Sequence, residues 1–329
     1  MSHLDNKLAF KAYLDALAYP GDFGAAARAI FAPDAVINVC HPFNALHGVE
    51  AYLERFLEPL TVSFEGLYRR DYILMGGPFG EGDWVTSTGY YAGHFARDWL
   101  GIKATGALAY LRVGEFHRFE GGRIVESYIF LDIPELMISA GVWPISDFPG
   151  KDRGYTGLLM GPASGDGIQM AENDPARSLS SAELVTTMLK GLATEDEAWR
   201  PFWHQNMVWY GPAAFGSFVG IENFAGFQVP FEQAFTHWSG GANGNGVTAH
   251  FTRFGDGDYI CTGGWPSLMA VRSETFLGQP SDGSTLLMRV CDWWRRDGDL
   301  LVENWVFVDI PDALLQMGYD LFEGTEYAA

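Results

Sequence analysis

The sequence predicts an α+β fold made of two tandem copies of one domain, each with three helices on a strongly curved antiparallel sheet. The first observation behind this prediction is an internal repeat: Glu115–Gly141 aligns without a gap on Asp292–Gly318, and nine of the 27 positions are identical. The second is the order of the patterns, because helical periodicity comes first in each copy and long strand patterns follow. A repeat of this length indicates a duplicated domain, not the short period of a solenoid. Helices segregated from an antiparallel sheet are typical of α+β folds.

Length and composition agree with a globular protein of two domains. The 329 residues are enough for two domains that each bury a core, and hydrophobic residues make up 48% of them. The net charge of −20 disfavours nucleic acid and anionic membranes as partners, because both attract basic proteins. Cys40, Cys261 and Cys291 are isolated thiols, which indicates a reducing compartment and no disulfide framework. With no signal-peptide pattern and no apolar run of membrane-spanning length, the expected location is cytoplasmic.

The first copy opens with two helices, predicted over Leu4–Ala18 and Phe23–Phe31. Apolar residues recur at helical spacing in the first of them, and Tyr19-Pro20-Gly21 ends it. A strand with the sequence FAPDAVINV follows, and a third helix is predicted over Leu46–Leu60. Four long strand patterns, separated by turn residues, complete the copy at residues 68–77, 83–95, 106–122 and 123–132. Helices that close one side of such a curved sheet leave a pocket suited to a small ligand.

The second copy repeats this order. Two capping-box patterns, Ser180-x-x-Glu183 and Thr194-x-x-Glu197, predict where its first two helices begin. The strand NMVWYG and a third helix over Phe218–Phe235 come next, followed by strands over residues 246–257, 258–271, 284–299 and 300–309. The domains are therefore predicted at residues 1–143 and 180–322, with a connector over residues 144–179 that is rich in Gly, Pro, Ser and Asp. A connector of this length is expected to pack partly on the domains.

Several motifs resemble the SnoaL-like polyketide cyclase group of the NTF2-like superfamily. In the first copy they are Cys40-His41-Pro42-Phe43-Asn44, Trp84-Val85-x-Ser87-Thr88-Gly89, Glu115-Phe116-His117-Arg118-Phe119 and Ile124-Val125-Glu126-x-Tyr128-x-x-x-Asp132. The second copy keeps Gly220-Ile221-Glu222, Asp292-Trp293-Trp294-Arg295 and Glu303-x-Trp305-x-x-x-Asp309. The resemblance covers both copies and implies tandem cone-shaped NTF2-like domains. Because single domains of this kind commonly dimerise sheet to sheet, it also implies an intramolecular pseudo-dimer, while further homo-oligomerisation is left open.

The resemblance implies that an Asp and a His near the positions of Asp132 and His117 act as acid and base. Strand alternation and a hairpin turn at Gly121-Gly122 pair His117 close to Glu126, which shares a face with Asp132, and the register decides whether the His117 ring points inward or outward. A carboxylate that faces an apolar pocket has a raised pKa, which suits proton transfer near neutral pH. The second copy has Trp294 in place of His117, so the first copy is the predicted catalytic domain and the second has a diverged pocket.

Other interpretations of these residues stay open. Asp132 and Asp309 each precede Ile-Pro and a short helical pattern, so a helix N-cap explains both equally well. His117 fits equally well as a surface strand residue beside Arg118.

Aromatic side chains recur on the strands where pocket walls are expected. The candidate substrate-binding residues are His41, Trp84, Tyr90, His94, Tyr110, Tyr128, Trp294, Trp305 and Asp309. The sequence contains no dinucleotide fingerprint, P-loop, HExxH or GxSxG motif and no metal-ligand spacing, so neither a cofactor nor a metal is expected. The predicted function is cofactor-independent acid/base catalysis of the cyclase, isomerase, dehydratase/lyase or hydrolase type on a small apolar or aromatic oxygenated molecule. The alternative is a non-catalytic protein that binds a hydrophobic ligand.

Overall fold

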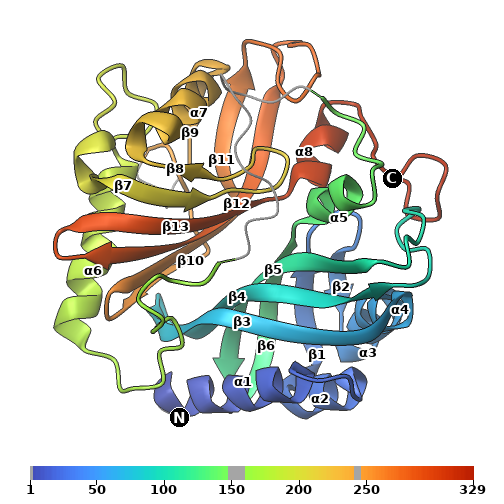
Figure 1. Ribbon diagram of the computed structural model, residues 1–329. Coiled ribbons are helices and arrows are strands. Elements are labelled where there is room, and N and C mark those ends of the chain that lie inside the picture. The colour runs from blue at the N-terminus through green and yellow to red at the C-terminus, as the bar shows by residue number, and fades with distance from the viewer. Residues whose placement is uncertain (1–2, 147–159, 241–245) are drawn as a thin grey trace. The chain divides into compact units, whose positions relative to one another are not determined.

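The computed structural model describes residues 3–146, 160–240 and 246–329, and they form two compact units (Figure 1). The first unit comprises the chain up to Trp143 together with Met160–Asn173 and Asp320–Ala329. The rest of the described chain, chiefly Asp174–Tyr319, forms the second unit. The segment expected as a connector is thus divided between the units, and its residues 147–159 lie outside the described part.

The first unit is a six-stranded sheet with helices packed on it. Its helices are α1 (His3–Leu17), α2 (Phe23–Ile30), α3 (Val49–Tyr52), which continues through a π-helical turn η1 (Leu53–Leu57) into α4 (Glu58–Ser63), and α5 (Ile133–Ser139). Its strands are β1 (Phe31–Val39), β2 (Asn44–His47), β3 (Phe64–Phe79), β4 (Gly82–Phe95), β5 (Leu108–Glu120) and β6 (Arg123–Leu131), in the order β2-β1-β6-β5-β4-β3. Helix α1 packs along β3 and β4 (Figure 1).

The second unit repeats this plan. Its helices are α6 (Pro175–Leu189), the 3-10 turn η2 (Arg200–Phe202), α7 (Ile221–Gln233) and α8 (Ile310–Gln316). Its strands are β7 (Trp203–Tyr210), β8 (Phe218–Val219), β9 (Phe235–Ser239), β10 (Thr252–Asp256), β11 (Tyr259–Arg272), β12 (Thr285–Asp297) and β13 (Leu300–Val308). The sheet order is β10-β11-β12-β13-β7-β8, with β9 paired to β11.

The α+β class is confirmed, but the sheets are mixed and not purely antiparallel. In the first unit β1 runs parallel to β6, and in the second β7 runs parallel to β13. The strands were predicted from local alternation of apolar and polar residues. Such alternation carries no information on whether a partner strand far away in the sequence runs parallel or antiparallel. Each parallel pair joins the first strand of a unit to its last, so local patterns could not set its direction.

The helix starts in the second unit differ from the predicted capping boxes. Helix α6 begins at Pro175 because the Asp174 carboxylate accepts hydrogen bonds from the N–H groups of Ala176 and Arg177, so Ser180 lies inside the helix. Thr194 does accept a hydrogen bond from the Ala198 N–H, yet only the short turn η2 follows. Among its described residues, the second unit therefore has no counterpart of the full helix α2.

One irregularity in the β5–β6 hairpin decides which side chains face the interior. Glu120 pairs with Arg123 and Phe119 with Ile124, but the next pairs are Arg118 with Glu126 and His117 with Ser127. Val125 is the extra residue of this β-bulge, which shifts the register by one and exchanges the faces. The β12–β13 hairpin shifts at the same point, so that Trp294 pairs with Asn304 and Asp292 with Val306.

We call the sheet face that α1 covers in the first unit the inner face, and the opposite one the outer face. On the inner face the His117 ring lies 4.6 Å from the Phe10 ring of α1, centroid to centroid. Ser87 and Glu115 share this face with His117, since Val85 pairs with His117 and Ser87 with Glu115. In the second unit, register equivalence places Asp292 and Trp294 on the inner face.

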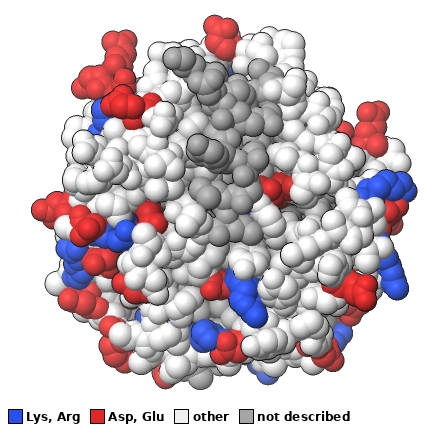
Figure 2. All heavy atoms as spheres, in the orientation of Figure 1, with Lys and Arg blue, Asp and Glu red and all other residues white. Residues whose placement is uncertain are grey.

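Charged side chains on the surface are mostly acidic. On the face drawn in Figure 2, red acidic groups are scattered widely and the blue basic groups are fewer. Several basic side chains are paired with acids, as Arg28 is with Glu50 and Arg177 with Asp258.

Candidate functional site

The two residues predicted as an acid/base pair lie on opposite faces of the first sheet. His117 is fully buried on the inner face. Asp132 follows β6 on the outer face, where its carboxylate pairs with Arg112, 3.3 Å from Nη1 to Oδ2. The predicted juxtaposition is therefore corrected: the bulge at Val125 turns His117 away from Glu126 and from the face of Asp132. The two side chains cannot work on one substrate atom across a shared pocket.

His117 belongs to a buried charged cluster on the inner face. Its Nε2–H donates to Glu115 Oε2 over 2.9 Å, and the Ser127 hydroxyl lies 2.8 Å from Nδ1. Glu115 also accepts from the Arg69 guanidinium, which chelates Asp71 through Nε and Nη2 and bonds the Ser87 and Tyr91 hydroxyls. These groups satisfy one another's hydrogen-bonding capacity and fill the space on the inner face of the first sheet.

The electrostatics of this cluster favour a fixed arrangement of charges. Burial opposes ionisation of Glu115, but the charge of Arg69 and the hydrogen bonds from His117 outweigh it and hold the pKa at about 2. Burial lowers the pKa of His117 in spite of the Glu115 carboxylate, so its imidazole is neutral at pH 7. An ionised Glu115 beside a His117 whose pKa is lowered fits a structural role better than proton transfer.

The repeated aspartates differ in their capping role. Asp309 Oδ1 accepts from the Asp312 N–H over 3.2 Å and Oδ2 bonds Arg289 over 2.9 Å, so it is an N-cap of α8. Asp132 occupies the same place before α5 but forms no side-chain cap hydrogen bond. The Arg–Asp pair, not the cap, is the feature that the two repeats share.

Most of the predicted substrate-binding residues lie outside the inner faces. Trp84, Tyr90, His94, Tyr110 and Tyr128 are on the outer face of the first sheet, and the Trp84 and Tyr128 rings lie 6.4 Å apart. Trp305 stacks on Tyr210 on the outer face of the second sheet, with ring centroids 5.0 Å apart. His41 lies in the loop after β1 against the Phe322 ring. Trp294 alone among the predicted residues lines the cavity described next.

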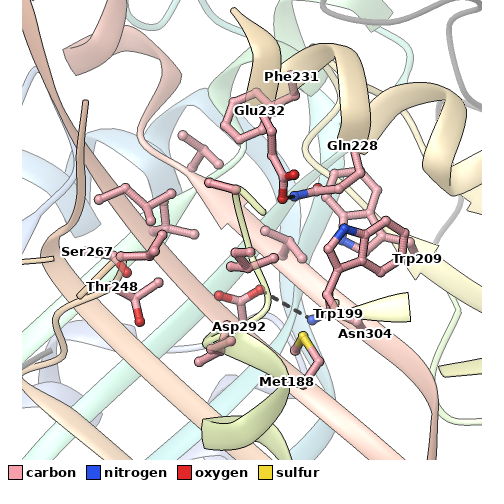
Figure 3. Close-up of a pocket in the computed structure, with 18 of the residues that line it drawn as sticks. Met188, Trp199, Trp209, Gln228, Phe231, Glu232, Thr248, Ser267, Asp292 and Asn304 are labelled. Carbon is pink, nitrogen blue, oxygen red and sulfur yellow. Dashed lines mark hydrogen bonds between the residues drawn. The ribbon is translucent and has the colours of Figure 1, made fainter. Parts of the chain in front are cut away.

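A cavity of about 120 Å³ opens on the inner face of the second sheet (Figure 3). Its walls come from α6, α7, the segment before η2 and strands β7, β11, β12 and β13. Aromatic side chains dominate the lining: Trp199, Trp203, Trp209, Phe215, Phe224, Phe227, Phe231, Trp238 and Trp294. Since one water needs about 10–15 Å³, the cavity holds on the order of ten water-sized groups, which suits a one- or two-ring molecule.

A carboxyl group faces this apolar cavity. Asp292 is partly exposed, and its Oδ1 and Oδ2 accept hydrogen bonds from Asn304 Nδ2 over 3.3 Å and from the Thr262 hydroxyl over 3.4 Å. Burial raises the pKa of Asp292 to about 7, and these two hydrogen bonds offset the shift only in part. The described lining contains no Lys or Arg to counter this charge. Asp292 can therefore hold or release a proton at neutral pH.

A second carboxyl and an imidazole complete the polar lining. Glu232 of α7 accepts from Gln228 Nε2 over 2.8 Å, and burial raises its pKa. Figure 3 shows the Glu232 carboxyl extending from α7 on the side of the cavity opposite Asp292. Burial, aided by the charge of Arg253, lowers the pKa of His250 to about 3, so this ring is neutral at pH 7.

The sequence prediction missed Asp292 because the residue exchange at its position conserves the chemistry of the side chain. Asp292 aligns with Glu115, a like-for-like replacement, whereas the change of His117 to Trp294 indicated a degenerate pocket. The bulge-corrected register places Asp292 and Trp294 side by side on the inner face.

No group of three His, Cys, Asp or Glu side chains in the described ranges is placed to hold a metal ion. No helix of this part of the chain is both long and apolar enough to cross a membrane.

Comparisons with known proteins found similar solved structures but no curated relative. No curated protein matches the chain. Among solved structures, AclR from Streptomyces galilaeus is similar at 20% identity, with a TM-score of 0.38 over 45% of this chain and 91% of AclR. IdmH from Streptomyces antibioticus, a candidate polyketide cyclase, is similar at 20% identity, with a TM-score of 0.35 over 42% of this chain and 99% of IdmH. An NTF2-like protein from Burkholderia thailandensis E264 is similar at 20% identity, with a TM-score of 0.33 over 44% of this chain and all of that one.

The match to a family model lies in the first repeat. Residues 10–127 match the family model described as the SnoaL-like domain. They span α1 to β6, the elements that build the first sheet and its helices. The second unit repeats their strand order, their parallel first-to-last pairing and their hairpin bulge. The chain thus carries a SnoaL-like domain over residues 10–127, followed by a second domain of the same fold.

Proposed function

We propose that the cavity of the second unit binds a small apolar or aromatic oxygenated molecule and that Asp292 transfers a proton on it. The observation that carries the proposal is a carboxyl group with a pKa of about 7 facing an aromatic cavity. General acid/base catalysis is most efficient when the pKa of the group lies near the working pH. The reaction class is cyclisation, isomerisation, elimination or hydration without a cofactor.

The proton transfer that this geometry supports starts at a carbon beside a carbonyl group. The Asp292 carboxylate takes the proton, and the C–H bonding electrons move onto the carbonyl oxygen to form an enolate. The neutral Asp292 carboxyl then returns the proton to a carbon or to a departing oxygen. Glu232, whose pKa is also raised, is a second proton donor at the opposite wall.

Deuterium exchange tests this role without knowledge of the natural substrate. The probe is 1-tetralone, a bicyclic ketone that matches the cavity in size, and its uptake of deuterium beside the carbonyl from D₂O is followed by NMR. The protein is expected to accelerate exchange, and Asp292→Asn is expected to lower the rate by roughly 10²- to 10⁴-fold. Asp299→Asn, at a fully exposed acid in the turn between β12 and β13, is the matched control.

Two outcomes contradict the proposal. Unchanged exchange in Asp292→Asn removes the assignment of Asp292. Tight binding of the ketone with no acceleration in the parent protein favours the alternative, a non-catalytic protein that binds a hydrophobic ligand in this cavity.

A further inference from the structure

We infer that the cavity of the second unit takes a ligand that carries a cationic nitrogen, an amine or a quaternary ammonium group, held between the carboxyl groups of Asp292 and Glu232. The inference rests on the proposed function in that the same cavity binds the ligand, and it narrows the ligand to aromatic oxygenated molecules with a positive charge. It concerns binding and not proton transfer, so an equilibrium measurement tests it separately.

Two carboxyl groups line the cavity from different elements, and neither meets a basic side chain there. Asp292 of β12 lies on the inner face and keeps part of its surface exposed, while Glu232 of α7 lines the opposite side (Figure 3). Their hydrogen-bond donors are the uncharged side chains of Asn304, Thr262 and Gln228. Within the described part of the chain no Lys or Arg lines the cavity. Because buried carboxylates need a counter-charge, a cationic ligand is the group that this lining favours.

The other titratable groups around the cavity do not supply that positive charge. His250 lines the cavity, but burial and the charge of Arg253 lower the pKa of its imidazole to about 3, so the ring is neutral. Arg253 itself is not among the lining residues. Glu197 acts on Glu232 from the segment before η2, and its own charge is paired with Arg200. The charge of the lining is therefore set by the two carboxyl groups.

The aromatic walls favour a cation for an independent reason. Aromatic rings attract ammonium groups, Trp most strongly, and the attraction grows where water is excluded. Five tryptophans belong to the lining: Trp199, Trp203, Trp209, Trp238 and Trp294. Coulomb attraction to a carboxylate acts over several bond lengths in a cavity of low dielectric constant, so it needs no single fixed hydrogen-bond direction. A neutral apolar group gains neither the Coulomb nor the cation–π attraction.

The ionisation of Asp292 couples the binding of a cation to the release of a proton. Burial raises the pKa of Asp292 to about 7, and a positive charge bound nearby lowers it, because the carboxylate then has a counter-ion. Below pH 7 the cation must displace this proton, whereas above pH 7 the carboxylate is already formed. The affinity for a cation should therefore fall roughly tenfold from pH 8 to pH 6. A neutral ligand should not show this fall, since it gains nothing from the carboxylate.

A matched ligand pair tests the inference. Phenyltrimethylammonium and tert-butylbenzene have the same shape and differ in charge. Titrations of the full chain, followed by tryptophan fluorescence, are expected to show the cation binding roughly tenfold more tightly than the hydrocarbon at pH 8. An uncharged apolar cavity has the reverse preference, because the cation loses its hydration on entering. At pH 6, calorimetry in buffers of different ionisation enthalpy should show about one proton released for each cation bound.

Variants that keep the shape of the side chain and remove its charge assign the effect. Asp292→Asn and Glu232→Gln are each expected to weaken cation binding at pH 8 by roughly tenfold, with little change for tert-butylbenzene. Asp292→Asn should also remove the dependence on pH. Glu222→Gln is the matched control, since Glu222 is an exposed acid on the same helix α7, and it should leave both affinities unchanged.

Measurements on the parent protein decide the inference even where a variant misfolds. Tighter binding of tert-butylbenzene than of the cation at pH 8 overturns it, and so does a cation affinity that does not fall from pH 8 to pH 6. Binding of the hydrocarbon alone leaves the proposed binding function in place, whereas failure of both probes to bind overturns both. Cation binding without deuterium exchange of 1-tetralone supports the inference and contradicts only the catalytic role of Asp292.

Discussion

At the scale of single residues, Glu115 and Asp292 occupy equivalent positions in the two repeats but differ in pKa, which is lowered for Glu115 and raised for Asp292. Each carboxyl lies on the strand before the hairpin and pairs across the sheet with a hydroxyl residue, Ser87 or Thr262. Arg69 lies beside Glu115 and fixes its charge, whereas Asp292 accepts hydrogen bonds from Asn304 and Thr262, both uncharged. The sequence alone could not separate them, because Arg69 reaches Glu115 from two strands away and no local pattern encodes that contact.

The raised pKa of Asp292 predicts an unusual dependence of stability on pH. The pKa rises from 3.8 to about 7 on folding, so between these values the folded state holds a proton that the unfolded state releases. Stability therefore falls as the pH rises from about 4 to about 7. Asp292→Asn removes this loss, which is on the order of a few kcal/mol, and should raise the melting temperature above that of the parent at pH 8.

Thermal unfolding followed by circular dichroism at pH 5 and pH 8 tests this prediction. The variant should gain less over the parent at pH 5 than at pH 8, because most of the loss develops as the pH rises from 5 to 7. A variant that is less stable than the parent at pH 8 would show that Asp292 is ionised and favourably paired.

Removing the charge of Arg69 from the buried cluster of the first unit is predicted to lower the stability of that unit strongly. Arg69→Leu leaves Glu115 and Asp71 buried without their common counter-ion, and should destabilise the first unit by about 3–5 kcal/mol. Arg28→Leu is the matched control, because Arg28 forms a two-bond pair with Glu50 that is exposed and screened by water, so its loss should matter far less. Urea unfolding measures both, and equal losses would mean that the cluster contributes no more than a surface ion pair.

At the scale of elements, the sequence predicted most helices and strands but not every side-chain face. Apolar periodicity located α1 and α2, and the long strand patterns match β4, β5, β6 and β11 to β13 closely. The hairpin bulge was invisible because an extra Val125 leaves the alternation of neighbouring residues unchanged while it exchanges their faces. Because of this shift, His117 lies on the inner face whereas Tyr128 and Asp132 lie on the outer face, so His117 and Asp132 do not form the predicted pair.

The C-terminal segment Asp320–Ala329 is an element that the sequence assigned in part to the second domain. It belongs to the first unit, where the Phe322 ring is fully buried 5.4 Å from the His41 ring and Tyr327 lies 6.1 Å from Phe43. Gly101 approaches it closely, since a Cβ there would lie 2.5 Å from the Thr325 methyl group. Aromatic contacts over so long a sequence separation leave no local signature.

This segment is predicted to stabilise the first unit. Phe322→Ala should cost about 3–5 kcal/mol, the usual loss for a buried Phe, whereas Leu321→Ala, at a partly exposed neighbour, should cost far less. Hydrogen exchange should accelerate at residues 40–43 and 99–102, which lie against the segment or beside those that do. Faster exchange confined to β12 and β13 would contradict the assignment of the segment to the first unit.

At the scale of the whole molecule, duplication has produced two units with one fold and different interiors. The first fills its inner face with Arg69, Glu115, His117 and the tyrosines that surround them. The second keeps its inner face open and apolar around Asp292. The expectation that the first copy carries the chemistry followed from its histidine, and the proposed function now assigns the chemistry to the second. The predicted pseudo-dimer stays a prediction.

Because the interiors of the two units differ, we predict that one chain binds one ligand although it contains two domains of the same fold. All residues that line the cavity belong to the second unit, and the corresponding space in the first is occupied by a guanidinium and its partners. Calorimetric titration with 1-tetralone should therefore saturate at one molecule per chain. Val306→Trp, which adds a bulky ring beside Asp292, should abolish binding without exposing a second site. Saturation at two molecules per chain, or binding that survives Val306→Trp, would show that the first unit also opens to a ligand and that the two interiors have not diverged in function.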